Sequence, residues 1–119
     1  IMVYKSPTCG CCNKWVSHLQ ENGFEVETTD LNDLRVIKSM SGIRPEQASC
    51  HTAKVGDYVV EGHVPADDIK RLLAERPEAR GLTVPGMPKG SPGMEHPNPD
   101  HYQVLLLGND GTTEVFAEH

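Results

Sequence analysis

Residues 9–12 carry three thiols in four positions, in the sequence CGCC. Cys9 and Cys12 have the spacing of a redox-active dithiol, in which one thiolate attacks and the other resolves the mixed disulfide. A dithiol enzyme gains little from Cys11, because a third nucleophile beside a disulfide invites exchange with the wrong partner. Thiolates are also preferred ligands of Cu(I), and adjacent thiolates can bridge two metal ions. The motif therefore predicts a soft-metal site for more than one ion, with a redox dithiol as the alternative.

These thiols lie where a helix is expected to begin. After Cys9, apolar side chains recur at helical spacing as far as Leu19, and the pattern ends near Gly23. The first N–H groups of a helix are unpaired and carry partial positive charge, which lowers the pKa of a nearby thiol. Thiolate is both the nucleophile and the metal ligand, so the position suits either function.

Further donors follow later in the chain. Cys50 and His51 precede a turn at Gly56, where a thioredoxin-like fold places a loop, usually with a cis-proline, against its Cys-x-x-Cys motif. We therefore expect Cys50 to lie within reach of the other three sulfurs. The additional candidate ligands, for each of which packing, capping or a place beside a strand is the alternative, are His51, His63, Met87 and Met94.

The hydrophobic pattern predicts an α/β fold with the element order β-α-β-α-β-β-α in residues 1–77. This order is that of the thioredoxin-like core, with a parallel crossover followed by a hairpin. Asp30 or Asn32 is expected to cap the second helix. The expected strands are 1–5, 24–28 and a hairpin within 49–62, and the expected helices are 9–23, 31–42 and 64–77.

Residues 78–119 are expected to extend this core as a wrapping loop and a β-hairpin. The segment 81–101 is rich in proline and glycine, which predicts irregular structure throughout. Asn109, Asp110 and Gly111 stand between two apolar runs and predict a hairpin that adds to the edge of the sheet. No linker divides the chain, so we expect residues 1–119 to form a single domain.

Composition excludes several classes of protein. The chain of 119 residues has a formal net charge of −6 and no cluster of Lys and Arg, which argues against nucleic acid as a partner. No apolar run approaches the roughly 18 residues that a membrane span requires. A disulfide within residues 9–12 would close almost no loop, so these cysteines contribute little to stability. Their arrangement favours chemistry instead.

Three segments together resemble the CopG family of small bacterial copper-resistance proteins: CGCC after a first strand, SCHTAKVGDYVVEGHVP in mid-chain and GLTVPGMPKGSPGME near the end. The resemblance implies a thioredoxin-like fold, a periplasmic location and a redox role for bound copper. It also implies copper held by Cys9, Cys11, Cys12 and Cys50. The start at Ile1 rather than Met is expected to reflect a processed N-terminus without its signal peptide.

We expect the metal to be Cu(I), in more than one ion, with Cu(II) formed on oxidation, and the partner to be a periplasmic copper-handling or electron-donor protein. Two alternatives stay open: a metal-free thiol–disulfide oxidoreductase that uses Cys9 and Cys12, and a non-catalytic Cu(I) carrier or store. Zinc would suit four cysteines but leaves the methionines unexplained. The spacing of the first three cysteines fits none of the usual iron–sulfur motifs.

Overall fold

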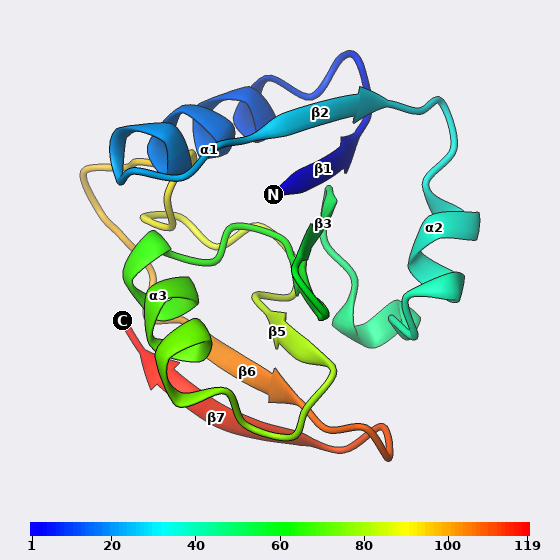
Figure 1. Ribbon diagram of the computed structural model, residues 1–119. Helices are drawn as coiled ribbons and strands as arrows, with labels where there is room; N and C mark the ends of the chain where they lie inside the picture. The colour runs from blue at the N-terminus through cyan, green and yellow to red at the C-terminus, as the bar shows by residue number, and fades with distance from the viewer.

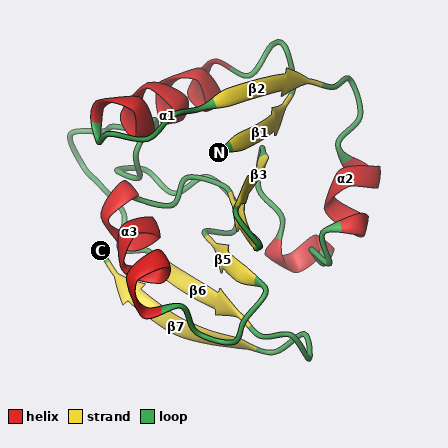
Figure 2. Cartoon of the chain, in the orientation of Figure 1, coloured by secondary structure: helices red, strands yellow, loops and turns green.

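Seven strands form one mixed sheet in the computed structural model, which describes residues 1–119 (Figures 1 and 2). The strands are hydrogen-bonded in the order β2-β1-β3-β4-β5-β6-β7. The pairs β1–β2 and β4–β5 are parallel, and the others are antiparallel. The elements are β1 Met2–Lys5, α1 Gly10–Glu21, β2 Glu27–Asp30, α2 Arg35–Met40, a 3-10 turn Pro45–Gln47, β3 Thr52–Val55, β4 Tyr58–Glu61, α3 Ala66–Glu75, β5 Gly81–Thr83, β6 Gln103–Leu107 and β7 Thr113–Glu118.

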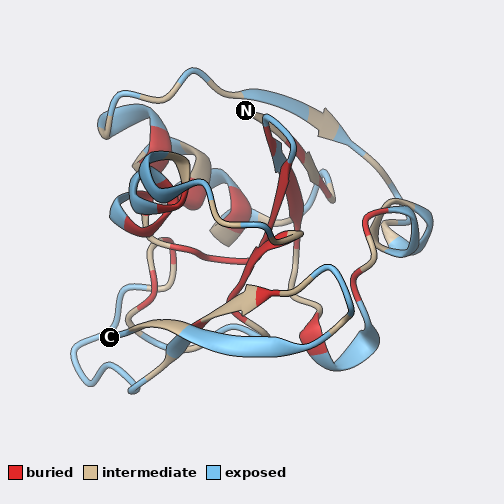
Figure 3. Ribbon diagram, turned by 60° about the horizontal axis from the view of Figure 1, so that its bottom comes forward, coloured by how far each residue is buried: buried red, intermediate tan, exposed pale blue.

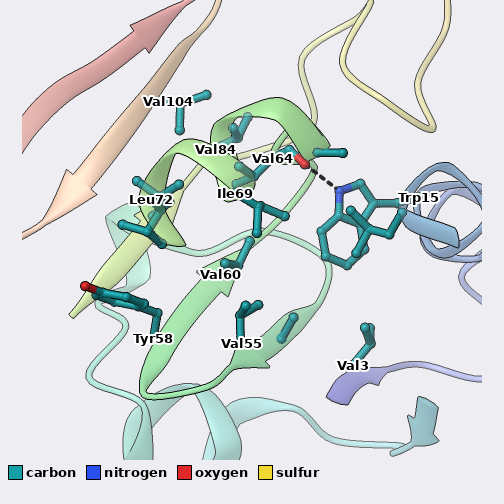
Figure 4. Close-up of a cluster of buried hydrophobic side chains, with 14 residues drawn as sticks. Val3, Trp15, Val55, Tyr58, Val60, Val64, Ile69, Leu72, Val84 and Val104 are labelled. Carbon is teal, nitrogen blue, oxygen red and sulfur yellow. Dashed lines mark hydrogen bonds between the residues drawn. The ribbon is translucent and has the colours of Figure 1, made fainter. Parts of the chain in front are cut away.

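The main core lies between the sheet and the helices α1 and α3, which cover the same face (Figures 1 and 4). Both helices have an apolar stripe, and Trp15, Leu19, Ile69 and Leu72 from these stripes are fully buried. The Trp15 Nε1–H donates to the carbonyl oxygen of Val64 at 2.9 Å, which ties α1 to the segment before α3. The buried side chains of α1 and this hydrogen bond therefore fix the position of the helix that carries Cys11 and Cys12.

The opposite face of the sheet has a much smaller core. Ile43, Val59 and Leu107 form it, with Ala48 packed against them. The helix α2 buries none of its residues and is coloured exposed or intermediate in Figure 3. Apolar burial therefore does not fix α2 in place. No helix in the chain combines the length and the apolar character needed to cross a membrane.

The mixed α/β class expected from the sequence is confirmed, and the thioredoxin-like assignment stays a prediction. The helices expected at 9–23 and 64–77 are present as α1 and α3. The hairpin expected within 49–62 is present as β3 and β4, and the hairpin at Asn109-Asp110-Gly111 as β6 and β7, with β7 at the edge of the sheet. Strong periodicity and clear turn residues account for this agreement.

The expectation of irregular structure throughout 81–101 is wrong at its beginning. Gly81–Thr83 form β5, which pairs with β4 on one side and β6 on the other. Leu82 is fully buried within this strand. A strand of three residues that ends near a proline has almost no local signal, because its hydrogen bonds all go to distant segments. The strand joins the first part of the sheet to the C-terminal hairpin.

Two further element boundaries differ from expectation. The strand expected at 24–28 begins only at Glu27, and Phe24 and Val26 pack against the core from the chain before it. The helix α2 begins at Arg35, and neither Asp30 nor Asn32 caps it. The alternation at 24–28 correctly indicates that Phe24 and Val26 pack against the core. A buried side chain does not require, however, that its backbone belong to the sheet.

Replacing Gly81 by alanine should reduce the free energy of unfolding by about 3 kcal/mol, because a Cβ cannot be accommodated in the centre of the sheet. An added Cβ would lie 1.7 Å from the carbonyl oxygen of Val59, which is backbone and cannot rotate away. Urea denaturation measures the loss. Gly10→Ala is the control, because a Cβ there meets nothing within 4 Å. Equal stability of the two variants would contradict this account of β5.

Candidate metal centre

Four cysteine sulfurs converge at one end of the sheet. The Sγ atoms of Cys9, Cys11, Cys12 and Cys50 all lie within 4.8 Å of one another. Cys9 is the N-cap residue of α1, and Cys11 and Cys12 belong to its first turn. The strands β1 and β3 are antiparallel neighbours, so the end of β1, which leads into α1, lies beside the start of β3, which Cys50 precedes. This pairing explains why Cys50 meets three cysteines that lie 38 to 41 positions earlier in the chain.

Two of the four cysteines are joined by a disulfide. Cys9 and Cys12 form a disulfide, and Cys11 and Cys50 are free. The Sγ of Cys11 lies 3.4 Å from that of Cys9. Cys12 is fully buried and the other three are partly exposed, so solvent reaches the cluster from one side. Reduction of the disulfide would present four thiols within one small volume.

Two buried imidazoles adjoin the sulfurs. The Nε2 atom of His63 lies 3.0 Å from the Cys50 Sγ. The Nδ1 atom of His51 lies 3.2 Å from the Cys50 Sγ and 3.3 Å from the Cys12 Sγ. Cys50, His51 and His63 thus form a second group with the spacing of metal ligands, which shares Cys50 with the first. Copper accepts both thiolate and imidazole ligands, so the donor set suits this metal.

The hydrogen bonds of His63 make its Nε2 atom a hydrogen-bond acceptor toward Cys50. Its Nδ1 donates to the carbonyl oxygen of Pro92 at 2.6 Å, which fixes the tautomer and leaves the Nε2 lone pair toward the sulfur. Burial lowers the pKa of His63, although the carbonyl of Pro92 opposes the shift. The imidazole is therefore neutral at neutral pH, which is the state that binds metal.

His51 is held more tightly still. Its ring is fully buried and packs on Trp15 with ring centroids 4.3 Å apart. Burial, and then the charge of His63, lower the pKa of His51 to about 3. Its Nε2 is buried without a hydrogen-bond partner. The polar atom that is engaged, Nδ1, faces the sulfurs of Cys12 and Cys50.

The surroundings of Cys50 keep its thiol protonated at neutral pH. Burial raises its pKa to about 11, and the hydroxyl of Ser49, 3.8 Å away, opposes the shift only in part. A metal ion that binds Cys50 must therefore displace its proton, so we expect proton release on metal binding.

The proline- and glycine-rich loop lies along the cluster. Pro92 contacts His63 as described, and a Cβ added at Gly93 would lie 2.7 Å from the Cys11 carbonyl oxygen. The loop thus approaches the site so closely that only glycine fits at position 93. Met87 is 44% exposed and Met94 is partly exposed, and a ligand role for either stays a prediction.

The register of the β3–β4 hairpin shows how His63 could have been located from sequence. Thr52 pairs with Glu61, and extending the same register by two residues places Cys50 opposite His63. The turn at Gly56-Asp57 was recognised in the sequence, so this pairing needed no other information. Packing or capping had been the alternative for His63, and its contact with Cys50 now favours a site role.

The largest cavity lies elsewhere. It has a volume of about 740 Å³ and is bordered by α2 and the segment after it, and it contains none of the cysteines or histidines of the clusters. The cysteines pack against one another rather than around a pocket.

In the metal-free protein, stability should fall as the pH decreases from about 6.5 to about 3. The unfolded chain protonates His51 near its ordinary pKa of 6.5, whereas the folded chain resists protonation until about pH 3. The unfolded state therefore binds more protons in this interval, and the free energy of unfolding decreases. Urea denaturation across this range measures the effect. His51→Gln should flatten the dependence, and an unchanged profile in this variant would contradict the assignment.

Comparisons with known proteins relate this chain to copper resistance proteins. Two solved structures, named copper resistance protein CopG in forms 1 and 2, are each 44% identical to the chain with a TM-score of 0.94. The matches cover 99% of this chain and 94% and 95% of theirs. A family model described as "Protein of unknown function, DUF411" matches residues 47–94, which include Cys50, His51 and His63. No curated protein matches the chain by sequence.

The likeness extends over almost the full length of the chain and is far too high to reflect the fold alone. It includes the segments that carry all four cysteines of the cluster. The resemblance first drawn from CGCC and the mid-chain motif is therefore confirmed, and the chain belongs to the CopG family of copper resistance proteins.

Proposed function

We propose that this protein is a periplasmic copper-binding protein of copper resistance that holds several Cu(I) ions in a thiolate cluster. The observation that carries the proposal is the convergence of four sulfurs, from Cys9, Cys11, Cys12 and Cys50, within 4.8 Å of one another. Each of several ions can share sulfurs in such a volume, because thiolates bridge. In this proposal, Cys11 supplies a bridging sulfur beside the Cys9–Cys12 dithiol.

The chemistry of the donors supports copper over zinc. The sulfurs are soft ligands, and His51 and His63 offer neutral imidazoles beside Cys50. Copper bound there would supply one-electron redox chemistry. The protein would contribute a buried, preorganised set of donors and a loop that limits access of water. Met87 and Met94 are outer candidates in that loop.

The redox part of the proposal is supported by the Cys9–Cys12 disulfide. Conversion of this dithiol to the disulfide releases two electrons and two protons, and two Cu(II) ions that accept these electrons become two Cu(I) ions. The disulfide sulfurs are no longer thiolate ligands, so closing the disulfide also weakens the Cu(I) site. Copper binding and the thiol redox state would therefore be coupled, and a periplasmic reductant would be needed to reopen the pair.

The test is an anaerobic Cu(I) titration against a competing chelator, with the fully reduced protein and the Cys9–Cys12 disulfide form side by side. We expect more than one tightly held ion per chain in the reduced form and fewer in the disulfide form. One Cu(I) ion per chain, or none, in the reduced form would contradict the proposed thiolate cluster. Zinc titration under the same conditions is the control for a general thiolate site, because four cysteines would hold one zinc tetrahedrally.

The second candidate is a metal-free thiol–disulfide oxidoreductase, and the disulfide between Cys9 and Cys12 also favours it. Such an enzyme would reduce a model disulfide substrate without copper, and its two thiolates would hold at most one Cu(I) ion. In the proposed copper protein, the reduced form should hold more than one Cu(I) ion, because Cys11 and Cys50 add sulfurs to the dithiol. The Cu(I) stoichiometry of the reduced protein, measured beside the rate of substrate reduction by the protein without copper, distinguishes the two.

A further inference from the structure

A buried ion pair links α2 to the segment that carries Cys50. Glu61, in β4, is fully buried, and its carboxylate pairs with the ammonium group of Lys38 from α2. The Lys38 side chain is only 15% exposed. Neither residue is among the candidate metal donors, and α2 itself has no fully buried residue that would fix its position.

The same carboxylate holds the chain on both sides of Cys50. The backbone N–H of Ser49 donates to Oε2 of Glu61 at 2.8 Å, and the hydroxyl of Thr52 donates to Oε1. The Nζ of Lys38 also donates to the Thr52 hydroxyl at 3.1 Å. One buried pair therefore fixes the residue before Cys50 and the second residue after it.

The segment from Ser49 to Thr52 has no aliphatic side chain, and its packing in the core comes from the ring of His51, which lies against Trp15. The Cys50 side chain extends instead toward His63, His51 and the sulfurs of α1. Its backbone thus has the Glu61 carboxylate as an anchor, while its sulfur serves the cluster.

We propose that Lys38 and Glu61 are positioning residues that set the geometry of Cys50 for metal binding. The inference rests on the proposed function, in which Cys50 is a ligand. A carboxylate buried this completely costs free energy unless a cation and hydrogen-bond donors surround it. Removing Lys38 takes away the ion-pair partner of Glu61 and a hydrogen bond to Thr52, so the hold of the carboxylate on Ser49 and Thr52 weakens.

The experiment compares Lys38→Met with Lys54→Met. Both remove a lysine, but Lys54 is exposed on β3 and makes no contact with the pair. Groups that orient metal ligands from behind typically change metal affinity by about 10-fold to 100-fold when removed. We expect Lys38→Met to lower Cu(I) affinity, measured by competition with bathocuproine disulfonate, by about tenfold at the weakest site, and Lys54→Met to leave it unchanged. Lys38→Arg, which keeps the charge, should retain most of the affinity.

A second readout does not depend on copper. The rate at which iodoacetamide modifies Cys50 in the reduced, metal-free protein, followed by peptide mass spectrometry, should increase severalfold in Lys38→Met, because the loosened segment exposes the thiol. Glu61→Gln should behave in the same way. If the wild type binds no Cu(I), the proposed function fails, and this rate still tests the positioning role.

The positioning role is overturned by either of two results. In the first, Lys38→Met lowers the melting temperature but keeps wild-type Cu(I) affinity and a wild-type rate of Cys50 modification, which would make the pair merely structural. In the second, Lys54→Met changes both readouts as much as Lys38→Met, which would make the effect one of net charge.

Discussion

Cys11→Ser should reduce the Cu(I) stoichiometry from more than one ion to about one ion per chain or below, because the cluster loses a bridging sulfur. Cys11 lies outside the disulfide, and its Sγ is 3.4 Å from that of Cys9. It also lies within reach of Cys50, since all four sulfurs are within 4.8 Å. A serine hydroxyl has nearly the same shape but is a poor ligand for Cu(I).

Two measurements on the same variant separate the proposed function from its rival. Anaerobic Cu(I) titration reports the cluster, and reduction of a model disulfide reports the Cys9–Cys12 dithiol. We expect the Cu(I) stoichiometry of Cys11→Ser to decrease to about one ion per chain or below, and its rate of disulfide reduction to stay at the wild-type value. Ser17→Ala, at an exposed position of the same helix, is the matched control and should change neither. Full Cu(I) binding by Cys11→Ser would remove the reason for a third thiol.

Trp15→Ala should reduce the free energy of unfolding by about 3–5 kcal/mol, which is a large part of the 5–15 kcal/mol that a domain of this size typically has. Trp15 is the largest of the fully buried side chains. Its loss leaves a cavity in the main core. It also leaves the carbonyl oxygen of Val64 without the hydrogen bond that the indole N–H donates. The ring also supports the imidazole of His51.

Urea denaturation of the metal-free protein measures this effect. Trp15→Phe is the matched variant, because it keeps an aromatic ring against His51 and loses the hydrogen bond with part of the volume. We expect Trp15→Phe to cost about 1–2 kcal/mol, well below the alanine variant. A loss under about 1 kcal/mol for Trp15→Ala would mean that the core does not depend on this side chain.

Much of the site could be predicted because its determinants are local. The spacing of Cys9, Cys11 and Cys12 and the apolar stripe behind them predicted thiols at a helix start, which the structure has. Cys50 was located by counting back from the turn at Gly56, because a tight hairpin fixes its own register. The same register places His63 opposite Cys50, although the sequence alone leaves packing or capping open for it.

The strand β5 shows where local reasoning stops. Gly81–Thr83 lie between β4 and β6, and their strand conformation follows from hydrogen bonds to segments about 20 residues away on either side. The composition of 81–101 predicts a loop correctly for most of its length. It contains no information about which of its residues will be drawn into the middle of a sheet.

The sequence by itself determined the chemistry of this protein: three thiols at the start of a helix, a fourth before a hairpin, and a likeness to the CopG family. Only the tertiary structure decided which side chains support that chemistry. Lys38 and Glu61 are ordinary charged residues in the sequence, and the role proposed for them depends on their ion pair and on the full burial of Glu61 beside Ser49. Periodicity and spacing report on neighbours within a few residues, whereas burial and electrostatics depend on contacts that exist only once the chain has folded.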